Sequence, residues 1–173
     1  MIHNCYQVGL TSLFCGLMAI STKEELQFLL HRALEIEKDF ESISVWKGFV
    51  SIGSEYRPTV LTLARESHKH RIDLEKLLKT LNMDGPTDEI PEENFNFEGL
   101  MDVEILQKIV EKDQTVEDLY AEIAKKTDLR LVSGLLGDEN VSVFYDLLNR
   151  LVADEKRHVK MVSSLTGTII RVQ

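Results

Sequence analysis

The chain has few of the residues that break helices and few that build disulfide frameworks. Its 173 residues include only three prolines, nine glycines and two cysteines, Cys5 and Cys15. Two cysteines without a CxxC pair exclude a disulfide scaffold and a thiolate metal knuckle, so we expect a reducing, cytoplasmic location. The scarcity of helix breakers, with abundant Leu, Glu, Lys and Ile, favours an all-α protein built around one domain.

Positive charge is also in short supply. The chain has 20 Lys and Arg residues against 29 Asp and Glu residues, which gives a net charge of −9. This balance argues against binding to a nucleic-acid backbone and suits the attraction of cations. We therefore expect metal ions, and no nucleic acid, among the partners of this protein.

Charged residues are missing from the first 22 positions, and residues 8–20 form an uncharged run. This run is too short to span a bilayer, and the basic region of a signal peptide is absent, so no membrane partner is expected. We describe residues 1–22 as an apolar N-terminal extension. It either packs as a short helix on the bundle or on a partner, or is absent from the protein because translation starts at Met18.

Helical periodicity divides the rest of the chain into four amphipathic segments. We expect the first helix over residues 23–49, the third over 100–126 and the fourth over 140–165. The second should follow a turn at residues 51–54 and end at residue 81. Thr22 and Glu25 form a capping-box pattern before the first helix, and Pro58 is tolerable only in the first turn of the second. A leucine cluster at 131–136 predicts an extra helical turn. Residues 23–165 thus predict a four-helix bundle, followed by a tail at 166–173.

The segment 82–99 is the one long linker, with two prolines, two glycines and six acidic residues. A helix of about 27 residues is roughly 40 Å long, and about 18 extended residues can run that length. The linker therefore predicts two antiparallel hairpins joined by a long crossover. The triplet Glu-Lys-Asp precedes an aromatic residue by the same spacing in residues 37–46 and 111–120, which favours a duplicated hairpin.

Polar residues fall inside the apolar stripes at similar depth on all four helices. At about 100° per residue, Glu37, His70, Asp113 and the pair Glu155 and His158 all point inward. Glu155 and His158 are three residues apart, so they share a helix face and can bind one ion together. A buried carboxylate is unfavourable unless it is paired or metal-bound. Four such positions predict a metal centre, and the alternative is a satisfied polar layer in the core.

Two stretches of sequence resemble a known family. Residues 33–39 (Ala-Leu-Glu-Ile-Glu-Lys-Asp) and 154–158 (Asp-Glu-Lys-Arg-His) are similar to helices of the ferritin-like superfamily, most of all its rubrerythrin branch. Over residues 23–165 the resemblance implies a ferritin-like bundle that holds two iron ions, or manganese. The ligands it implies are Glu37, His70, Asp113, Glu155 and His158, with Asp113 and Glu155 bridging or capping the pair.

The chain departs from the family pattern on the second helix, where Ser67 replaces the glutamate expected three residues before His70. Glu66 lies one residue earlier, and at i,i+4 from His70 it is a further candidate ligand. Ser44 stands where the family often has an inward tyrosine. The sequence therefore leaves three possibilities for the centre: two metal ions bound unequally, one ion, or none. If metal binds, Ser67 predicts weaker binding of the ion nearer His70.

The resemblance implies an oxidoreductase that reduces peroxide or activates dioxygen, in oxidative stress or iron metabolism. The sequence has no rubredoxin-like CxxC pair, so such an activity requires a separate electron donor. The alternatives are a non-enzymatic metal-binding protein and a scaffold with a degenerate centre. Rubrerythrin-like bundles commonly pair, so we expect a homodimer, and the residues after 165 are too few for the fifth helix of a ferritin cage.

Overall fold

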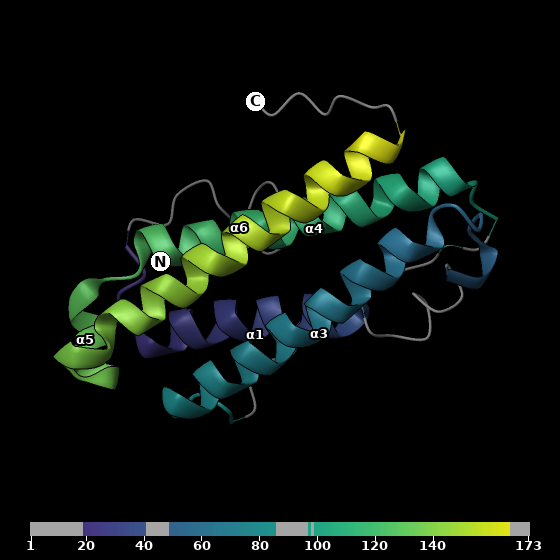
Figure 1. Cartoon of the computed structure of the whole chain (residues 1–173). Coiled ribbons are helices and arrows are strands. Elements are labelled where there is room, and N and C mark those ends of the chain that lie inside the picture. The colour runs from purple at the N-terminus through teal and green to yellow at the C-terminus, as the bar shows by residue number, and fades with distance from the viewer. Residues whose placement is uncertain (1–18, 41–48, 86–96, 98, 167–173) are drawn as a thin grey trace, which may run out of the picture.

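The computed structural model describes residues 19–40, 49–85, 97 and 99–166. Its long helices are α1 (Lys23–Phe40), α3 (Arg57–Thr80), α4 (Asp102–Lys126) and α6 (Val141–Thr166), with the short α5 (Leu129–Leu136) and a 3₁₀ turn, η2 (Asp138–Asn140). The four long helices form a bundle (Figure 1), which confirms the expected all-α architecture. Within the described ranges, no helix is both long enough and apolar enough to cross a bilayer.

Several expected features lie outside the described residues. These are the N-terminal extension up to residue 18, the end of the first helix with Ser44, most of the linker (86–96 and 98) and the tail from residue 167. The other expected helix ends agree with the observed bounds to within about two residues, and the leucine cluster forms α5.

Local sequence explains where the helices begin. The Oγ1 of Thr22 accepts a hydrogen bond from the backbone N–H of Glu25, and the Glu25 carboxylate accepts one from the Thr22 N–H, each over 3.2 Å. This reciprocal pair is a capping box. Pro58 lies in the first turn of α3, where its missing N–H has no intrahelical partner to lose. Asp128 caps α5 by accepting from the N–H of Arg130 at 2.7 Å.

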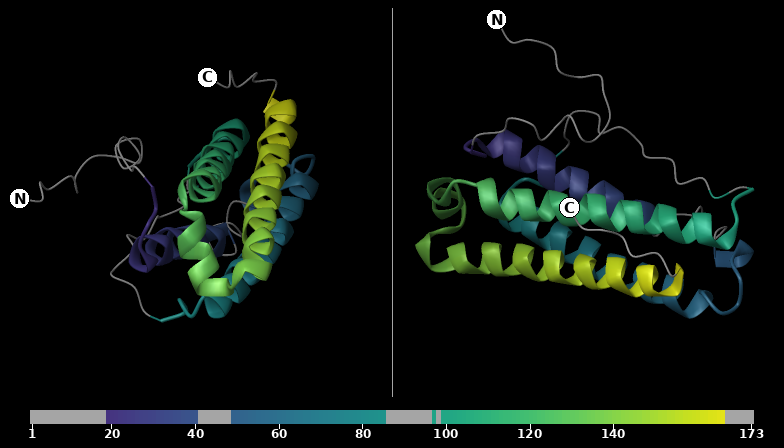
Figure 2. Two further views of the ribbon diagram at one scale, coloured as in Figure 1. Left: turned by 90° about the vertical axis from the view of Figure 1, so that its left-hand side faces the viewer. Right: turned by 90° about the horizontal axis from the view of Figure 1, so that it is seen from above.

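The helices pair as α1 with α3 and α4 with α6, and the two pairs meet along α1–α4 and α3–α6. Neighbouring helices run antiparallel (Figure 2). Gly53, just before α3, donates its N–H to Oδ2 of Asp102 over 3.2 Å, so α3 and α4 begin at the same end of the bundle. Ile20 forms a parallel β-bridge with Thr127 at the opposite end. Since α3 ends far from where α4 begins, the chain between them must run the length of the bundle, which confirms the long crossover.

Each long helix buries an apolar stripe that polar residues interrupt, near the middle of α3, α4 and α6 and near the end of α1. His70 lies between Leu63 and Leu74 on α3, and corresponding polar positions interrupt the stripes of the other three helices. The six polar residues of this layer, all buried, are Glu37, Ser67, His70, Asp113, Glu155 and His158. Apolar residues above and below keep water from this layer, so any charge within it needs a partner.

Candidate metal centre

The polar layer draws carboxylates and imidazoles from all four helices. Their ligand atoms form two groups, each within 4.8 Å: Glu37, His70 and Glu155 in the first, and Asp113, Glu155 and His158 in the second. Every member is at most 4% exposed. Glu155 belongs to both groups, so the layer is one connected site with two halves.

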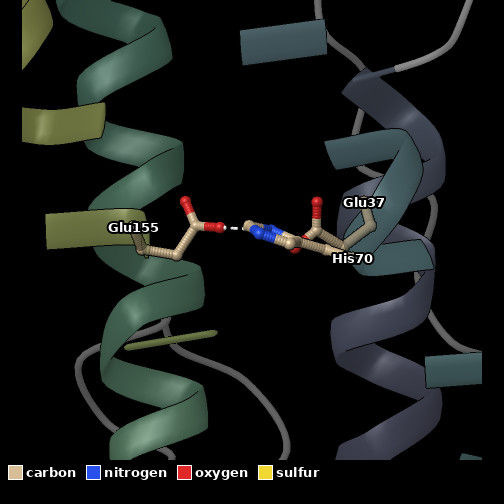
Figure 3. A group of neighbouring side chains, drawn as sticks. All are labelled: Glu37, His70 and Glu155. Carbon is tan, nitrogen blue, oxygen red and sulfur yellow. Dashed lines mark hydrogen bonds and ion pairs between the residues drawn. The ribbon is translucent and has the colours of Figure 1, made fainter. Parts of the chain in front are cut away.

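The first half is centred on His70, which reaches from α3 toward α6 with Glu37 beside it (Figure 3). Its Nδ1 lies 2.8 Å from Oε1 of Glu155 and 3.3 Å from Oε1 of Glu37. The hydroxyl of Tyr120 on α4 donates a hydrogen bond to the same Glu37 oxygen over 2.6 Å. Side chains of α3 and α4 thus converge on the Glu37 carboxylate of α1, and His70 also contacts Glu155 of α6.

The second half is centred on His158, whose Nδ1 lies 3.1 Å from Oε2 of Glu155. The two oxygens of Glu155 therefore face two different histidines. The His70 and His158 rings stack with centroids 5.8 Å apart at an interplanar angle of 23°. Oδ2 of Asp113, which belongs to this half, has no hydrogen-bond partner among the described residues, and Oε1 of Glu155 has only its close approach to His70.

Two further acids contact the outer nitrogens of the histidines. Nε2 of His70 lies 3.4 Å from Oδ2 of Asp154, and Nε2 of His158 bonds to Oε2 of Glu66. Each acid precedes the histidine of its own helix by four residues and contacts the histidine of the other helix. An ionised carboxylate only accepts hydrogen bonds, so Nε2 is the donor in both rings. Nδ1 of each ring is then directed to the interior of the layer.

Arg157 joins the two outer acids. Its Nη2 lies 2.8 Å from Oδ1 of Asp154 and 3.0 Å from Oε2 of Glu66. Burial acts to raise the pKa of both carboxyls, but their hydrogen bonds to Arg157 and to a histidine outweigh it and lower the pKa below the usual value. Both acids are therefore ionised acceptors at neutral pH.

Glu66 does not lie where the sequence suggested. Its i,i+4 spacing made it a candidate to share an ion with His70. In the structure its carboxylate is directed to His158 and Arg157, and it belongs to neither ligand group. Sequence reasoning missed Asp154 and Arg157 altogether. The signal that could have found Asp154 is its spacing, because it precedes His158 by the same four residues that separate Glu66 from His70.

Burial and mutual repulsion disturb the acids of the layer. Burial raises the pKa of Asp113 well above 3.8, and the neighbouring Glu155 and Glu37 carboxylates raise it further. Burial also raises the pKa of Glu37. Burial lowers the pKa of His70, but its hydrogen bonds with Glu155 and Glu37 outweigh this effect and raise it to about 10. Without a cation, protons must therefore neutralise part of the layer.

The donor set fits a divalent transition metal. Three carboxylates and two imidazoles without a thiolate suit iron or manganese better than a soft metal. Oδ2 of Asp113, a buried oxygen without a hydrogen-bond donor among the described residues, is one that a cation would satisfy. The residues present are thus compatible with a carboxylate-rich metal centre.

Ser67 marks the difference between the two sides of the layer. It precedes His70 by three residues on α3, as Glu155 precedes His158 on α6, and it is 2% exposed. Residues three apart on a helix share a face, so Ser67 faces the bundle interior with His70. The layer consequently has a carboxylate on the α6 side and a short hydroxyl at the corresponding position of α3.

Comparison with known proteins supports the fold. A crystal structure from Bacillus anthracis str. Ames described as "ferritin like, diiron-carboxylate proteins" matches with a TM-score of 0.64 and 17% sequence identity, covering 84% of this chain and 99% of that one. The chain therefore has a ferritin-like fold, as expected from its sequence. No protein-family model matches the chain, and no curated protein is significantly similar to it in sequence.

Proposed function

We propose that the polar layer binds two divalent metal ions, iron or manganese, in a carboxylate-bridged centre similar to that of rubrerythrin. The proposed ligands are Glu37 and His70 for one ion, Asp113 and His158 for the other, and Glu155 for both. The description of the structural neighbour as a diiron-carboxylate protein supports the same metal chemistry here.

The observation that carries the proposal is the carboxylate of Asp113. It is 1% exposed, its Oδ2 has no hydrogen-bond partner among the described residues, and its nearest charged neighbours in the layer include the carboxylates of Glu155 and Glu37. A polar group buried without a partner is destabilising, and a carboxylate more so than a neutral group. A divalent cation between Asp113 and Glu155 would remove this penalty.

The outer acids support this arrangement. Glu66 and Asp154 hold the Nε2–H groups of His158 and His70, so Nδ1 of each ring, which lies beside Glu155, is the nitrogen that would bind an ion. A carboxylate that accepts the outer N–H of a ligand histidine orients the ring and increases its basicity. Arg157 pairs with both acids and balances part of their charge.

The reaction class that we propose is the reduction of peroxide or the activation of dioxygen. Bound iron would supply electrons by cycling between its ferrous and ferric states. The protein would hold the ions in a layer shielded from water, and Nδ1 of His70 would store a proton beside Glu155 until metal displaces it. The proposal includes a separate electron donor, since neither cysteine belongs to a CxxC pair, and a homodimer in the cytoplasm.

A second candidate is a metal-binding protein without catalytic turnover. The observation that favours it is Ser67, because a buried hydroxyl on the α3 side supplies neither the charge nor the two oxygens of a bridging carboxylate. A centre of this kind could bind iron or manganese without supporting repeated oxidation and reduction.

Metal analysis of the full-length protein after anaerobic loading with Fe(II) tests the proposal. We expect bound iron in the wild-type protein, loss of binding in Glu155→Ala, and unchanged binding in Glu111→Ala, which removes an exposed carboxylate of α4. Peroxide consumption with a chemical reductant then separates the two candidates. Repeated turnover supports the enzyme, and a single round of iron oxidation supports the metal-binding protein. Wild-type protein that binds no metal would contradict both.

A further inference from the structure

The ligands of the proposed centre have almost no contact with solvent. Every member of the two ligand groups is at most 4% exposed, and apolar residues lie above and below the layer. A metal ion from solvent can therefore reach these ligands only where side chains move aside. The interface between two helices whose side chains move most easily then sets how fast ions enter and leave.

The exposure of polar side chains rises step by step along the interface between α3 and α6. The side chain of His70 is 5% exposed, that of Asp154, which contacts it, 30%, and that of Arg157, which contacts Asp154, 52%. Glu66, 19% exposed, connects Arg157 to His158 in the same way. At the opposite interface, between α1 and α4, the partner of the layer is the fully buried Tyr120.

The guanidinium of Arg157 closes the α3–α6 interface. Its Nη2 lies 2.8 Å from Oδ1 of Asp154 and 3.0 Å from Oε2 of Glu66, and its Nη1 lies 3.2 Å from Oε1 of Glu66. A positively charged group thus already stands between two carboxylates from two helices. Because Arg157 is half exposed, these ion pairs are weak, and rotation of its side chain into solvent would uncover both carboxylates.

The imidazoles of the centre lie directly behind these carboxylates. Glu66 contacts Nε2 of His158, and Asp154 contacts Nε2 of His70. An ion that has passed the guanidinium is therefore already beside a proposed ligand of each half. Carboxylate oxygens readily replace the water molecules around a hard divalent cation, so the two outer acids would help an entering ion to lose its hydration shell. They contact the ion in passing and are not ligands of the bound centre.

We propose that Arg157 is the gate of the metal centre, and that divalent cations enter and leave between α3 and α6 when its guanidinium turns away from Glu66 and Asp154. This inference rests on the proposed metal centre. In its closed position the guanidinium repels an approaching cation and covers the two carboxylates. A barrier of this kind is crossed in both directions, so removing it should speed entry and release alike.

Two rate measurements on the full-length protein test the gate. Rapid mixing with Co(II), followed by its visible absorption, gives the rate of entry, and transfer of bound Co(II) to excess chelator gives the rate of release. In Arg157→Ala we expect both rates to rise by about tenfold or more, which is the scale of one unit charge a few ångströms from the ion. The affinity should change much less than either rate.

Arg150→Ala is the matched control. Arg150 joins the same two helices through Asp73 at 2.7 Å and is 58% exposed. It lies seven residues before Arg157 on α6, about 10 Å along the helix axis. At physiological ionic strength the field of an exposed charge at this distance is largely screened. Both rates in Arg150→Ala should therefore equal those of the wild type.

The two rates together separate a gate from other roles of Arg157. Faster entry with slower release in Arg157→Ala would show that the arginine acts only by repulsion through space. Faster release with unchanged entry would show that it only positions the outer acids. Either result overturns the gate.

Further outcomes separate the gate from the proposed function. Unchanged rates in Arg157→Ala, or equal acceleration in Arg150→Ala, overturn the gate while the metal centre stands, because these proteins still bind Co(II). Wild-type protein that binds no Co(II) overturns the centre and the gate together.

Discussion

Tyr120 on α4 donates a hydrogen bond to Glu37 on α1 over 2.6 Å, and both side chains are at most 1% exposed. The bond joins the first helix of one hairpin to the first helix of the other, inside the polar layer. Burial and the Glu37 carboxylate both raise the pKa of Tyr120 well above 10, so the phenol remains a donor at every physiological pH. Glu37 is thereby held by a neutral donor, beside the His70 ring whose Nδ1 lies 3.3 Å from the same oxygen.

Replacing Tyr120 with Phe should destabilise the metal-free protein by about 1–3 kcal/mol, because a buried carboxylate loses the shorter of its two hydrogen bonds. It should also weaken metal binding, since Glu37 loses its orientation. Denaturant unfolding and metal titration measure the two effects. Tyr145→Phe is the control, because it removes a hydroxyl that donates to the Thr127 carbonyl at 3.1 Å, away from the layer. Equal loss of metal affinity in both variants would contradict this role of Tyr120.

Asp113→Asn should have opposite effects on stability and on binding. Burial raises the pKa of Asp113, so the folded state loses stability at pH values where this acid ionises in the unfolded chain. The amide of asparagine does not ionise, so the variant should raise the melting temperature of the metal-free protein by a few degrees, at about 2–4 °C per kcal/mol. Added Mn(II) should raise the melting temperature of the wild type and not of the variant. Asp118→Asn, at an exposed position of α4, is the control. A variant that is less stable than the metal-free wild type would indicate a structural role for Asp113.

The stability of the metal-free protein should fall as the pH rises from 6.5 to about 10. The folded state raises the pKa of His70 from 6.5 to about 10, so its protonated ring stabilises the fold fully below 6.5, and this contribution is lost as the pH approaches 10. The loss should be on the order of a few kcal/mol. His70→Gln should flatten the profile, whereas His68→Gln, at an exposed position of the same helix, should not. Denaturant unfolding across this pH range measures the effect, and a flat wild-type profile would refute it.

The outer acids should control metal affinity without being ligands. Glu66→Gln should weaken the ion held by Asp113 and His158, and Asp154→Asn should weaken the ion held by Glu37 and His70, each by about 10–100-fold. Isothermal titration with Mn(II) measures both.

Asp73→Asn is the matched control for the outer acids. It removes a carboxylate that pairs with Arg150 at 2.7 Å across the same two helices, on the exposed surface. It should leave metal affinity unchanged. Complete loss of metal in Glu66→Gln would instead make Glu66 a direct ligand.

Much of the fold could be predicted from the chain because its determinants are local. The capping box of Thr22 and Glu25, the position of Pro58 and the helical spacing of apolar residues define the helices within about two residues. The length of the linker predicted a long crossover. Periodicity also identified which side of its own helix each acid occupies, so the inward direction of Glu37 and Asp113 followed from the apolar stripes around them.

The partners within the centre were decided only by the tertiary structure. Periodicity gives the direction of a side chain about its own helix axis, but not how far one helix is shifted along its neighbour. That shift puts Glu66 against His158 rather than His70, brings Asp154 to His70, and lets Glu155 face both histidines. The chain by itself therefore determined which residues enter the polar layer, and the packing of four helices decided which of them meet, because contacts across a bundle depend on the relative height of helices that are far apart in sequence.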